Sequence, residues 1–297
     1  MSDILIGLNL PTSAAEEADP VALAVEAEEL GFDFVSANDH PAAPDPSFEV
    51  WTLLAWVAAK TTRISLATRV LGVPFRAPAM VAKMAESLDR LSDGRLILGM
   101  GGGSSDEEFR AFGLGLPTPR EKIDGLDDAL HIIRGLWSRQ RFTFEGARYG
   151  TERATLEPKP SHHIPIWLGT LGPRGLDLAG RLADGWIPSY ELAPPERARV
   201  MRDRIRRAAS AAGRDPDEIR CVYNLEVRVD PEGSQEPAVI SGRPDEITER
   251  LVDLVQLGFT GFNFIPRGPD QAEQRALLAR EVLPALRGQS GRLSSPV

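Results

Sequence analysis

The chain has 297 residues, of which 42% are hydrophobic and 26% charged, and its formal net charge is −9. This length allows one large domain or two small ones, and the composition is that of a folded chain with a sizeable core. The acidic balance argues against nucleic acid or an anionic membrane as the main partner. A single cysteine, Cys221, excludes an internal disulfide framework and a cysteine-based metal site. Since no signal peptide or membrane-spanning stretch is recognisable, we expect a cytoplasmic protein.

Short β-rich runs alternate with helical patterns along the chain. The first helix is expected to begin at Asp19-Pro20, because Asp19 is a favourable N-cap and proline is favoured at the first helical position. The helix opened by Pro78 has an apolar stripe that we expect to face inward, formed by Met80, Met84, Leu88 and Leu91. The expected strands are residues 4–9, 32–36, 64–68, 95–100, 166–169, 185–188, 220–229 and 261–265.

Eight strands separated by helices predict an α/β fold, a single closed (β/α)8 barrel of the TIM type. A doubly wound open sheet is the alternative, but it usually carries a glycine fingerprint after the first strand, where this chain has Asn9-Leu10-Pro11-Thr12. Residues 104–164 break the alternation and are interpreted as an insertion after strand four, with a hairpin of 142–149 and 154–157. We expect one domain over residues 1–290 and a tail at 291–297.

A barrel of this type places its active site at the carboxyl ends of its strands. The side chains at or just after these ends are therefore candidates for the lining of a substrate pocket. The residues expected to line this pocket are Asn9, Trp186, Tyr190, Glu226 and Arg267. The insertion at 104–164 is expected to shape the pocket with them.

The pair Asp39-His40, after the second strand, is the sharpest candidate for chemistry. A histidine near a carboxylate can donate a proton, or a hydrogen bond to a ring. The alternative is that Asp39 accepts hydrogen bonds from turn N–H groups and His40 lies in a surface loop, and the residues alone slightly favour this alternative. The other histidines lack metal-ligand spacing, so no metal site is expected.

Two glycine-rich turns follow strands four and five. The first, Gly101-Gly102-Gly103-Ser104, lets a ligand approach the backbone closely, but it lacks the dinucleotide fingerprint and the lysine of a P-loop. The second, Gly169-Thr170-Leu171-Gly172-Pro173, leads into a helix and offers a phosphate free N–H groups, a helix dipole and a hydroxyl. From the residues alone, the first segment is better explained as a tight turn than as a ligand site. The second is explained equally well as a phosphate site and as an ordinary strand-to-helix connection.

Few side chains in the sequence are placed to do difficult chemistry unaided. There is no obvious serine–histidine–aspartate set, no reactive-cysteine context and no glycosidase-like carboxylate face. A bound cofactor would explain this, because the protein then has only to bind it, orient it and exclude water.

Several segments, in order and over nearly the whole chain, resemble the luciferase-like family of flavin- and deazaflavin-dependent oxidoreductases. They are AEELGFD at 27–33 leading to Asp39-His40, TRVL at 68–71 with PFRAP at 74–78, LDRLSDGRLILGMG at 88–101, EF at 108–109 with AFG at 111–113, PIWLG at 165–169, ADGW at 183–186, and the helix 242–257 with Gly258-Phe259.

The resemblance implies a barrel that binds FMN or coenzyme F420 at its carboxyl end. It implies a non-proline cis peptide at Arg69–Val70 that forms a bulge behind the cofactor ring, so Thr68, Arg69 and Val70 are expected to contact the cofactor. Asp39 and His40 match the ring-contacting pair of the family, and the two glycine turns match its phosphate contacts.

Two positions depart from the glucose-6-phosphate dehydrogenase branch of the family. Pro44 replaces a tryptophan and Ser104 replaces an acidic residue. A sugar-phosphate substrate is therefore not expected, and the proton donor is left open between His40 and a substrate-bound water.

The function expected from this resemblance is hydride transfer between F420 and a small organic substrate, with His40 as the catalytic residue. The alternatives are an FMN-dependent monooxygenase that uses reduced flavin and O2, and a flavin-binding relative without catalysis. The family also implies a homodimer and allows a separate flavin or F420 reductase as partner. Because the F420 tail is anionic and the chain is acidic, Arg69, Arg174 and Arg267 are candidates for local positive charge.

Overall fold

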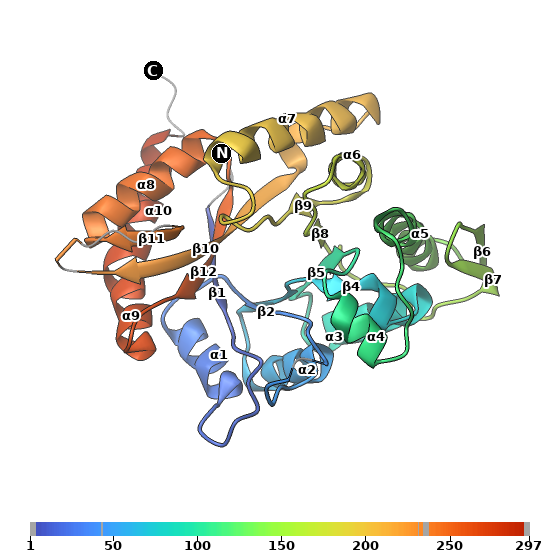
Figure 1. Ribbon diagram of the computed structural model, residues 1–297, viewed down its shortest axis with the longest axis horizontal. Helices are drawn as coiled ribbons and strands as arrows, with labels where there is room; N and C mark the ends of the chain where they lie inside the picture. The colour runs from blue at the N-terminus through green and yellow to red at the C-terminus, as the bar shows by residue number, and fades with distance from the viewer. Residues whose placement is uncertain (1–3, 43, 231, 234–237, 294–297) are drawn as a thin grey trace.

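Eight parallel strands close into a ring in the computed structural model, with helices on the outside of the ring (Figure 1). The last strand of the ring pairs with the first, which closes it. The structure describes residues 4–42, 44–230, 232–233 and 238–293. The predicted (β/α)8 barrel and its eight strand positions are confirmed. The strands of the ring are β1 (Leu5–Asn9), β2 (Phe34–Ala37), β3 (Ser65–Thr68), β5 (Leu96–Gly101), β8 (Ile166–Leu168), β9 (Gly185–Trp186), β10 (Arg220–Val229) and β12 (Gly261–Pro266).

Prolines begin most of the helices around the ring, because the first helical residue needs no N–H donor. At the first helix the Asp19 carboxylate also accepts hydrogen bonds from the N–H groups of Val21 and Ala22, so the predicted cap is confirmed. The outer helices are α1 (Pro20–Glu29), α2 (Val50–Lys60), α3 (Pro78–Leu91), α5 (Pro119–Ser138), α6 (Pro173–Leu182), α7 (Pro195–Ala211), α8 (Pro244–Gln256) and α9 (Gln271–Leu277), which continues through a π-helical turn (Leu278–Val282) into α10 (Leu283–Leu293).

Side chains at alternate positions of the strands fill the inside of the barrel. One layer is apolar and contains Phe34, Ala67, Ile97, Trp167 and Val222. The rings of Phe34 and Trp167 meet edge to face, with centroids 5.6 Å apart. Because successive residues of a strand point to opposite faces, the residues two positions further along each strand also point inward.

Two residues nearer the carboxyl ends, this inward layer becomes polar. Ser36, Asn224 and Asn263 are buried there. Ser36 Oγ donates a hydrogen bond to Asn263 Oδ1 at 3.0 Å, and Asn263 Nδ2 donates one to Asn224 Oδ1 at 2.9 Å. In the same layer β5 has Gly99, and Gly169 directly follows β8. In this layer the floor of the barrel mouth is therefore polar at β2, β10 and β12, and it has no side chain at Gly99 and Gly169.

The inward face of α3 differs from the predicted stripe. Met80 and Leu91 are 57% and 84% exposed, so this prediction is wrong for these two residues. The predicted stripe and the observed buried face of α3 both have helical spacing. The helix is rotated from the predicted orientation, so that smaller side chains face the strands. The buried apolar residues of α3 are Pro78, Val81, Ala82, Ala85 and Leu88.

The segment 104–164 contains a regular helix of the barrel as well as extra structure. The long helix α5 packs against both α3 and α6 in the outer layer. The extra parts are α4 (Asp106–Ala111) before it and a hairpin of β6 (Phe142–Glu145) and β7 (Gly150–Ala154) after it. The predicted hairpin is present, but its second strand covers Gly150–Ala154 instead of the predicted residues 154–157.

Two short strands were not predicted. One is β4 (Leu71–Gly72), which pairs with β5, and the other is β11 (Val239–Gly242), which pairs with β10. At the carboxyl end, α10 includes the first three residues of the expected tail, and residues 294–297 lie outside the described part of the chain. None of the described helices combines the length and apolar character needed to cross a membrane.

Candidate functional site

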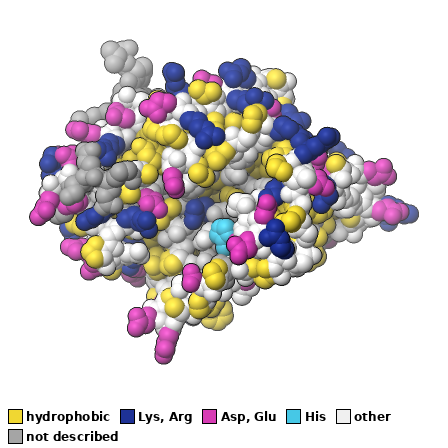
Figure 2. Space-filling model, in the orientation of Figure 1, with side chains coloured by type: hydrophobic (Ala, Val, Ile, Leu, Met, Phe, Trp, Pro, Cys, Tyr) yellow, Lys and Arg dark blue, Asp and Glu magenta, His cyan; other side chains and the backbone are white. Residues whose placement is uncertain are grey.

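A cavity of about 460 Å³ lies at the carboxyl ends of β2, β3, β5 and β8, within the size range of small-molecule sites. Figure 2 shows a hollow near the middle of the molecule with a histidine side chain at its edge. The cavity brings most of the predicted cofactor residues together. Its lining contains Asp39, His40, Arg69, Val70, Gly101, Gly102, Gly103, Ser104, Gly169, Thr170, Leu171 and Gly172, and adds Gly72, Phe75, Ser105, Pro119, Lys122 and Ile123.

Val70 forms one wall of this cavity. The Arg69–Val70 peptide bond is cis, as the resemblance implied. The valine side chain lies against two glycines: a Cβ at Gly101 would lie 2.9 Å from Val70 Cγ2, and a Cβ at Gly169 would lie 3.0 Å from the same atom. The absence of side chains at both positions therefore lets Val70 project into the mouth of the barrel.

Asp39 is buried and engaged by the loop that follows β3. Its carboxylate accepts a hydrogen bond from the Gly72 N–H at 3.0 Å and two from the Arg76 guanidinium at 2.8 and 2.9 Å. Arg76 also pairs with Glu49 at 2.5 Å. Burial alone lowers the pKa of Arg76, but the two carboxylates outweigh it and raise the pKa above its ordinary value. Asp39 therefore holds the cavity wall in place, and its contact with a turn N–H agrees with the simpler of the two sequence interpretations.

His40 has a buried partner that the sequence did not reveal. Its Nδ1 lies 2.6 Å from Glu108 Oε1, and Glu108 Oε2 accepts a hydrogen bond from the Ala42 N–H at 3.2 Å. Glu108 lies on α4, which Ser105 caps. A carboxylate next to Nδ1 favours the proton at that nitrogen, so Nε2 is left as the acceptor, or as the donor when the ring is protonated. Nε2 makes no hydrogen bond within the described part of the chain.

The second glycine turn leads into the N-terminus of α6. Gly172 is the N-cap, and a Cβ added there would meet no atom within 4 Å. The Thr170 side chain lies over the first turn of the helix, since a Cβ at Gly175 would be only 1.8 Å from Thr170 Oγ1. N–H groups without a side-chain cap, the helix dipole and a nearby hydroxyl make this a suitable site for a phosphate.

Most of the arginines that we expected to supply positive charge to the cavity do not line it. Arg174 pairs with Asp124 and Arg267 pairs with Glu226, and of the three candidate arginines only Arg69 lines the cavity. Sequence reasoning missed Lys122 on α5, which lines the cavity beside the first glycine turn and pairs with Asp106 at 2.6 Å. No local pattern distinguishes Lys122 from other surface lysines, because its position depends on how α5 packs.

Two predicted cofactor or pocket residues support the cavity without lining it. Thr68 Oγ1 donates a hydrogen bond to the Gly99 carbonyl at 2.8 Å and accepts one from the Gly99 N–H at 2.9 Å, which ties β3 to β5. Trp186 is fully buried and donates its indole N–H to the Thr170 carbonyl at 2.9 Å. Pro173 is the first residue of α6 and also lies outside the lining.

The remaining predicted pocket residues lie at strands that do not line this cavity. Asn9 Oδ1 accepts a hydrogen bond from Arg69 Nε at 2.9 Å. Tyr190 packs on the ring of Tyr223 with centroids 5.4 Å apart, and Glu226 pairs with Arg267 at 3.0 Å. The sequence placed these residues at strand ends, but the structure does not bring Tyr190, Glu226 or Arg267 to the cavity wall.

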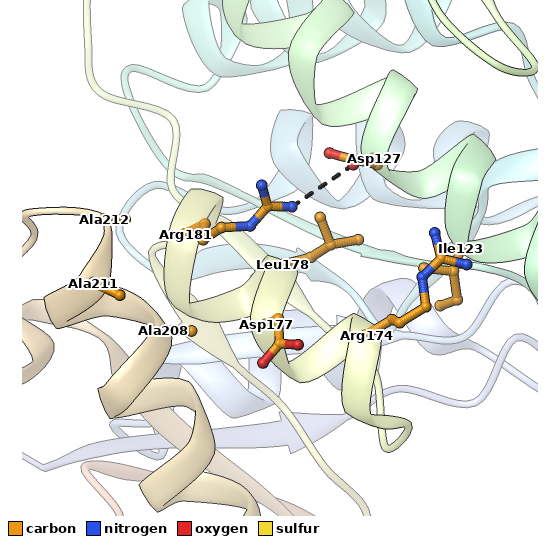
Figure 3. A pocket seen from close by; sticks show the side chains of 9 residues that line it. All are labelled: Ile123, Asp127, Arg174, Asp177, Leu178, Arg181, Ala208, Ala211 and Ala212. Carbon is orange, nitrogen blue, oxygen red and sulfur yellow. Dashed lines mark ion pairs between the residues drawn. The ribbon is translucent and has the colours of Figure 1, made fainter.

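A second hollow, between α5, α6 and α7, lies on the outside of the barrel (Figure 3). Its charged residues are already paired: Arg181 lies 3.7 Å from Asp127, and Asp177 lies 2.6 Å from Arg204. Of the residues expected to contact the cofactor, only Arg174 lines it, and Arg174 pairs with Asp124. In the described part of the chain, no group of three or more His, Cys, Asp and Glu side chains could hold a metal ion.

A comparison with protein families identifies the type of barrel. The model described as luciferase-like monooxygenase matches residues 6–235. Among relatives, the F420-dependent glucose-6-phosphate dehydrogenase of Nakamurella multipartita is 32% identical, over 94% of this chain and 96% of its own.

Solved structures share the fold at lower sequence identity. An F420-dependent secondary alcohol dehydrogenase, in complex with an F420–acetone adduct, has a TM-score of 0.86 at 20% identity and covers 96% of this chain and 99% of its own. A monooxygenase from Streptomyces bottropensis has a TM-score of 0.80 at 24% identity and covers 95% of this chain and 99% of its own.

Proposed function

Because the chain belongs to the luciferase-like monooxygenase family, we propose that it is an F420-dependent oxidoreductase. It transfers a hydride between the deazaflavin and a small organic substrate. One observation carries this proposal: Val70 projects between Gly101 and Gly169 into a cavity that opens beside the N-terminus of α6. An apolar wall next to a phosphate cradle is what a flat ring with a phosphorylated tail requires. The similarity to an F420-dependent dehydrogenase at 32% identity favours F420 over FMN.

The residues of the cavity fit this cofactor. When bound, F420 supplies a ring carbon that accepts or donates a hydride. Val70 would support the ring from behind, and the turns 101–104 and 169–172 would hold the phosphate together with the N–H groups of α6. The ammonium of Lys122, which pairs with Asp106 at 2.6 Å, would also lie near the anionic cofactor.

His40 is the residue that would exchange a proton with the substrate. Oxidation of an alcohol removes a hydride from its carbon and a proton from its oxygen. His40 Nε2 would accept that proton, and the buried Glu108 carboxylate would stabilise the imidazolium that forms. In the reverse direction the same imidazolium would return the proton to the carbonyl oxygen.

Cofactor binding separates the proposal from its main alternative. Purified protein is titrated separately with F420 and FMN, and the quenching of cofactor fluorescence is measured. Tight binding of F420 and weaker binding of FMN are expected. Tight FMN binding without F420 binding, together with O2 consumption in the presence of reduced FMN, would instead establish the monooxygenase function.

Turnover separates an enzyme from a relative without catalysis. F420-loaded protein is mixed with 2-propanol, glucose 6-phosphate and small hydroxy acids, and the absorbance of the oxidised deazaflavin is followed. We expect turnover with at least one small alcohol, little with the sugar phosphate, and a large loss of rate in His40→Ala. Cofactor binding without turnover of any compound, unchanged by His40→Ala, would identify a non-catalytic relative.

We further propose that the enzyme works in the cytoplasm as a homodimer, with a separate reductase that regenerates its cofactor. Trp56 on α2 and Met80 on α3 are large apolar side chains that are 59% and 57% exposed, on helices that pack side by side. A second copy could cover this surface. Sedimentation equilibrium tests the dimer, and Trp56→Lys should weaken it.

A further inference from the structure

The side chain of Arg69 points over the mouth of the barrel. Ala67, two residues earlier on β3, belongs to the apolar inner layer, so Arg69 continues the inward-facing positions of that strand. On β1, Gly7 faces the ring of Phe34 in the same layer, and Asn9 is the next inward position. The two inward residues meet, and Arg69 Nε donates a hydrogen bond to Asn9 Oδ1 at 2.9 Å.

No carboxylate in the described part of the chain balances the charge of Arg69. Other arginines near the barrel mouth are paired: Arg76 binds Asp39, and Arg267 binds Glu226. The hydrogen bond to Asn9 is the only one that the Arg69 side chain makes with described residues. Burial lowers the pKa of Arg69 to about 10, so the guanidinium remains charged at neutral pH and faces the cavity as a poorly solvated cation.

The free edge of this guanidinium matches a carboxylate. An arginine has five N–H donors, and those on its two terminal nitrogens can bind both oxygens of one carboxylate side by side. A phosphate dianion fits less well, because the lining offers one uncompensated cation and the carboxylate of Asp39 lies in the same cavity wall. The phosphate of the cofactor has its own cradle at α6.

We propose that Arg69 binds the carboxylate of the substrate, which is therefore a small hydroxy acid or the corresponding oxo acid. In the oxidative direction the hydroxyl carbon gives its hydride to oxidised F420, the hydroxyl proton goes to His40, and the carboxylate is unchanged. The identity of the substrate rests on the proposed function, whereas binding of a carboxylate by Arg69 can be measured without the cofactor.

The test compares 3-hydroxybutyrate with its methyl ester, which has the same carbon skeleton but no charge. Dissociation constants are measured by ligand-observed NMR on the protein alone and on the F420-loaded protein. Wild type should bind the acid at least tenfold more tightly than the ester. Arg69→Gln, which can still reach Asn9, should reduce this preference to less than twofold, and Arg69→Lys should retain part of it.

Arg204→Gln is the matched control, because it removes the same charge from an outer ion pair with Asp177. It should leave the tenfold preference intact. The Kd of F420 should change less than threefold in Arg69→Gln.

Equal binding of acid and ester by wild type would overturn the proposal without any variant. A preference that survives Arg69→Gln would also overturn it, and so would tighter binding of methyl phosphate than of the acid. If Arg69→Gln weakens F420 tenfold and the preference persists, the arginine belongs to the cofactor site. Failure of F420 to bind wild type would overturn the proposed function alone, since the acid-to-ester ratio of the cofactor-free protein still decides the role of Arg69.

Discussion

His40 Nδ1 lies 2.6 Å from Glu108 Oε1, although the two residues are 68 positions apart in the chain. Glu108 is buried and does not line the cavity, so it would act through His40. Glu108→Gln should lower kcat about tenfold or more, within the range of acid–base contributions, because a neutral amide stabilises an imidazolium poorly. Steady-state kinetics with the best alcohol substrate check this, and Glu108→Asp, which keeps the negative charge, should recover part of the lost kcat.

Glu107, the exposed neighbour on α4, provides the matched control. Glu107→Gln should leave kcat unchanged. F420 affinity should stay within threefold in both variants. A Glu108→Asp enzyme as slow as Glu108→Gln would reduce Glu108 to a structural role and contradict the assignment.

Local patterns along the chain explain why the barrel could be predicted. Strand and helix periodicities are short-range properties, and prolines such as Pro20 and Pro78 mark the helix starts. The rotation of α3 could not be predicted in the same way. Met80 and Val81 both belong to helical stripes, and only the packing against the strands decides which one is buried.

The candidate site could be predicted only in part for a related reason. The glycine turns and Val70 are adjacent to strand ends, so their positions follow from the fold. Glu108 stands in the acidic run Asp106-Glu107-Glu108, where nothing local shows which carboxylate is buried. Its contact with His40, like the position of Lys122, depends on segments far apart in the sequence.

Thr68 was predicted to bind the cofactor, but its hydroxyl is used in two hydrogen bonds with Gly99 beneath the mouth. Thr68→Val should therefore lower the free energy of unfolding by about 1–3 kcal/mol, the cost of leaving buried polar groups unpaired. Urea unfolding monitored by tryptophan fluorescence measures this. The Kd of F420 should change less than threefold. A variant of unchanged stability that binds F420 ten times more weakly would return Thr68 to the cofactor site.

Gly172 tests the phosphate cradle, because its Cβ position is open and its φ is −78°. Gly172→Asp should fold with wild-type stability. It should weaken F420 binding about tenfold or more, since it places a negative charge where the phosphate is expected. Fluorescence titration gives the Kd. Gly288→Asp is the control, because its Cβ position on α10 is equally open; similar F420 affinities in the two variants would argue against a phosphate at α6.

Glu28 gives the fold a pH dependence of its own. Its carboxylate accepts hydrogen bonds from the N–H groups of Thr62, Arg63 and Ile64 at 3.0, 2.6 and 2.8 Å, just before β3. Burial raises the pKa of Glu28, but these N–H groups outweigh it and hold the pKa at about 2, below the ordinary 4.5. Since the folded pKa is lowered, the stabilisation is complete above about pH 5 and is lost as the pH falls from 4.5 through 2.

Glu28→Gln should accordingly lower the free energy of unfolding at pH 7 by about 1–2 kcal/mol, a value reduced from the full linkage because the carboxylate is partly exposed. Urea unfolding at pH 7, 5 and 3 should show the gap between wild type and variant shrinking by more than half between pH 5 and 3. Glu29→Gln, the exposed neighbour, should show no gap at any pH. A gap that stays constant from pH 7 to pH 3 would show that the Glu28 carboxylate gains nothing from these N–H groups, and that the variant is destabilised by a loss of packing alone.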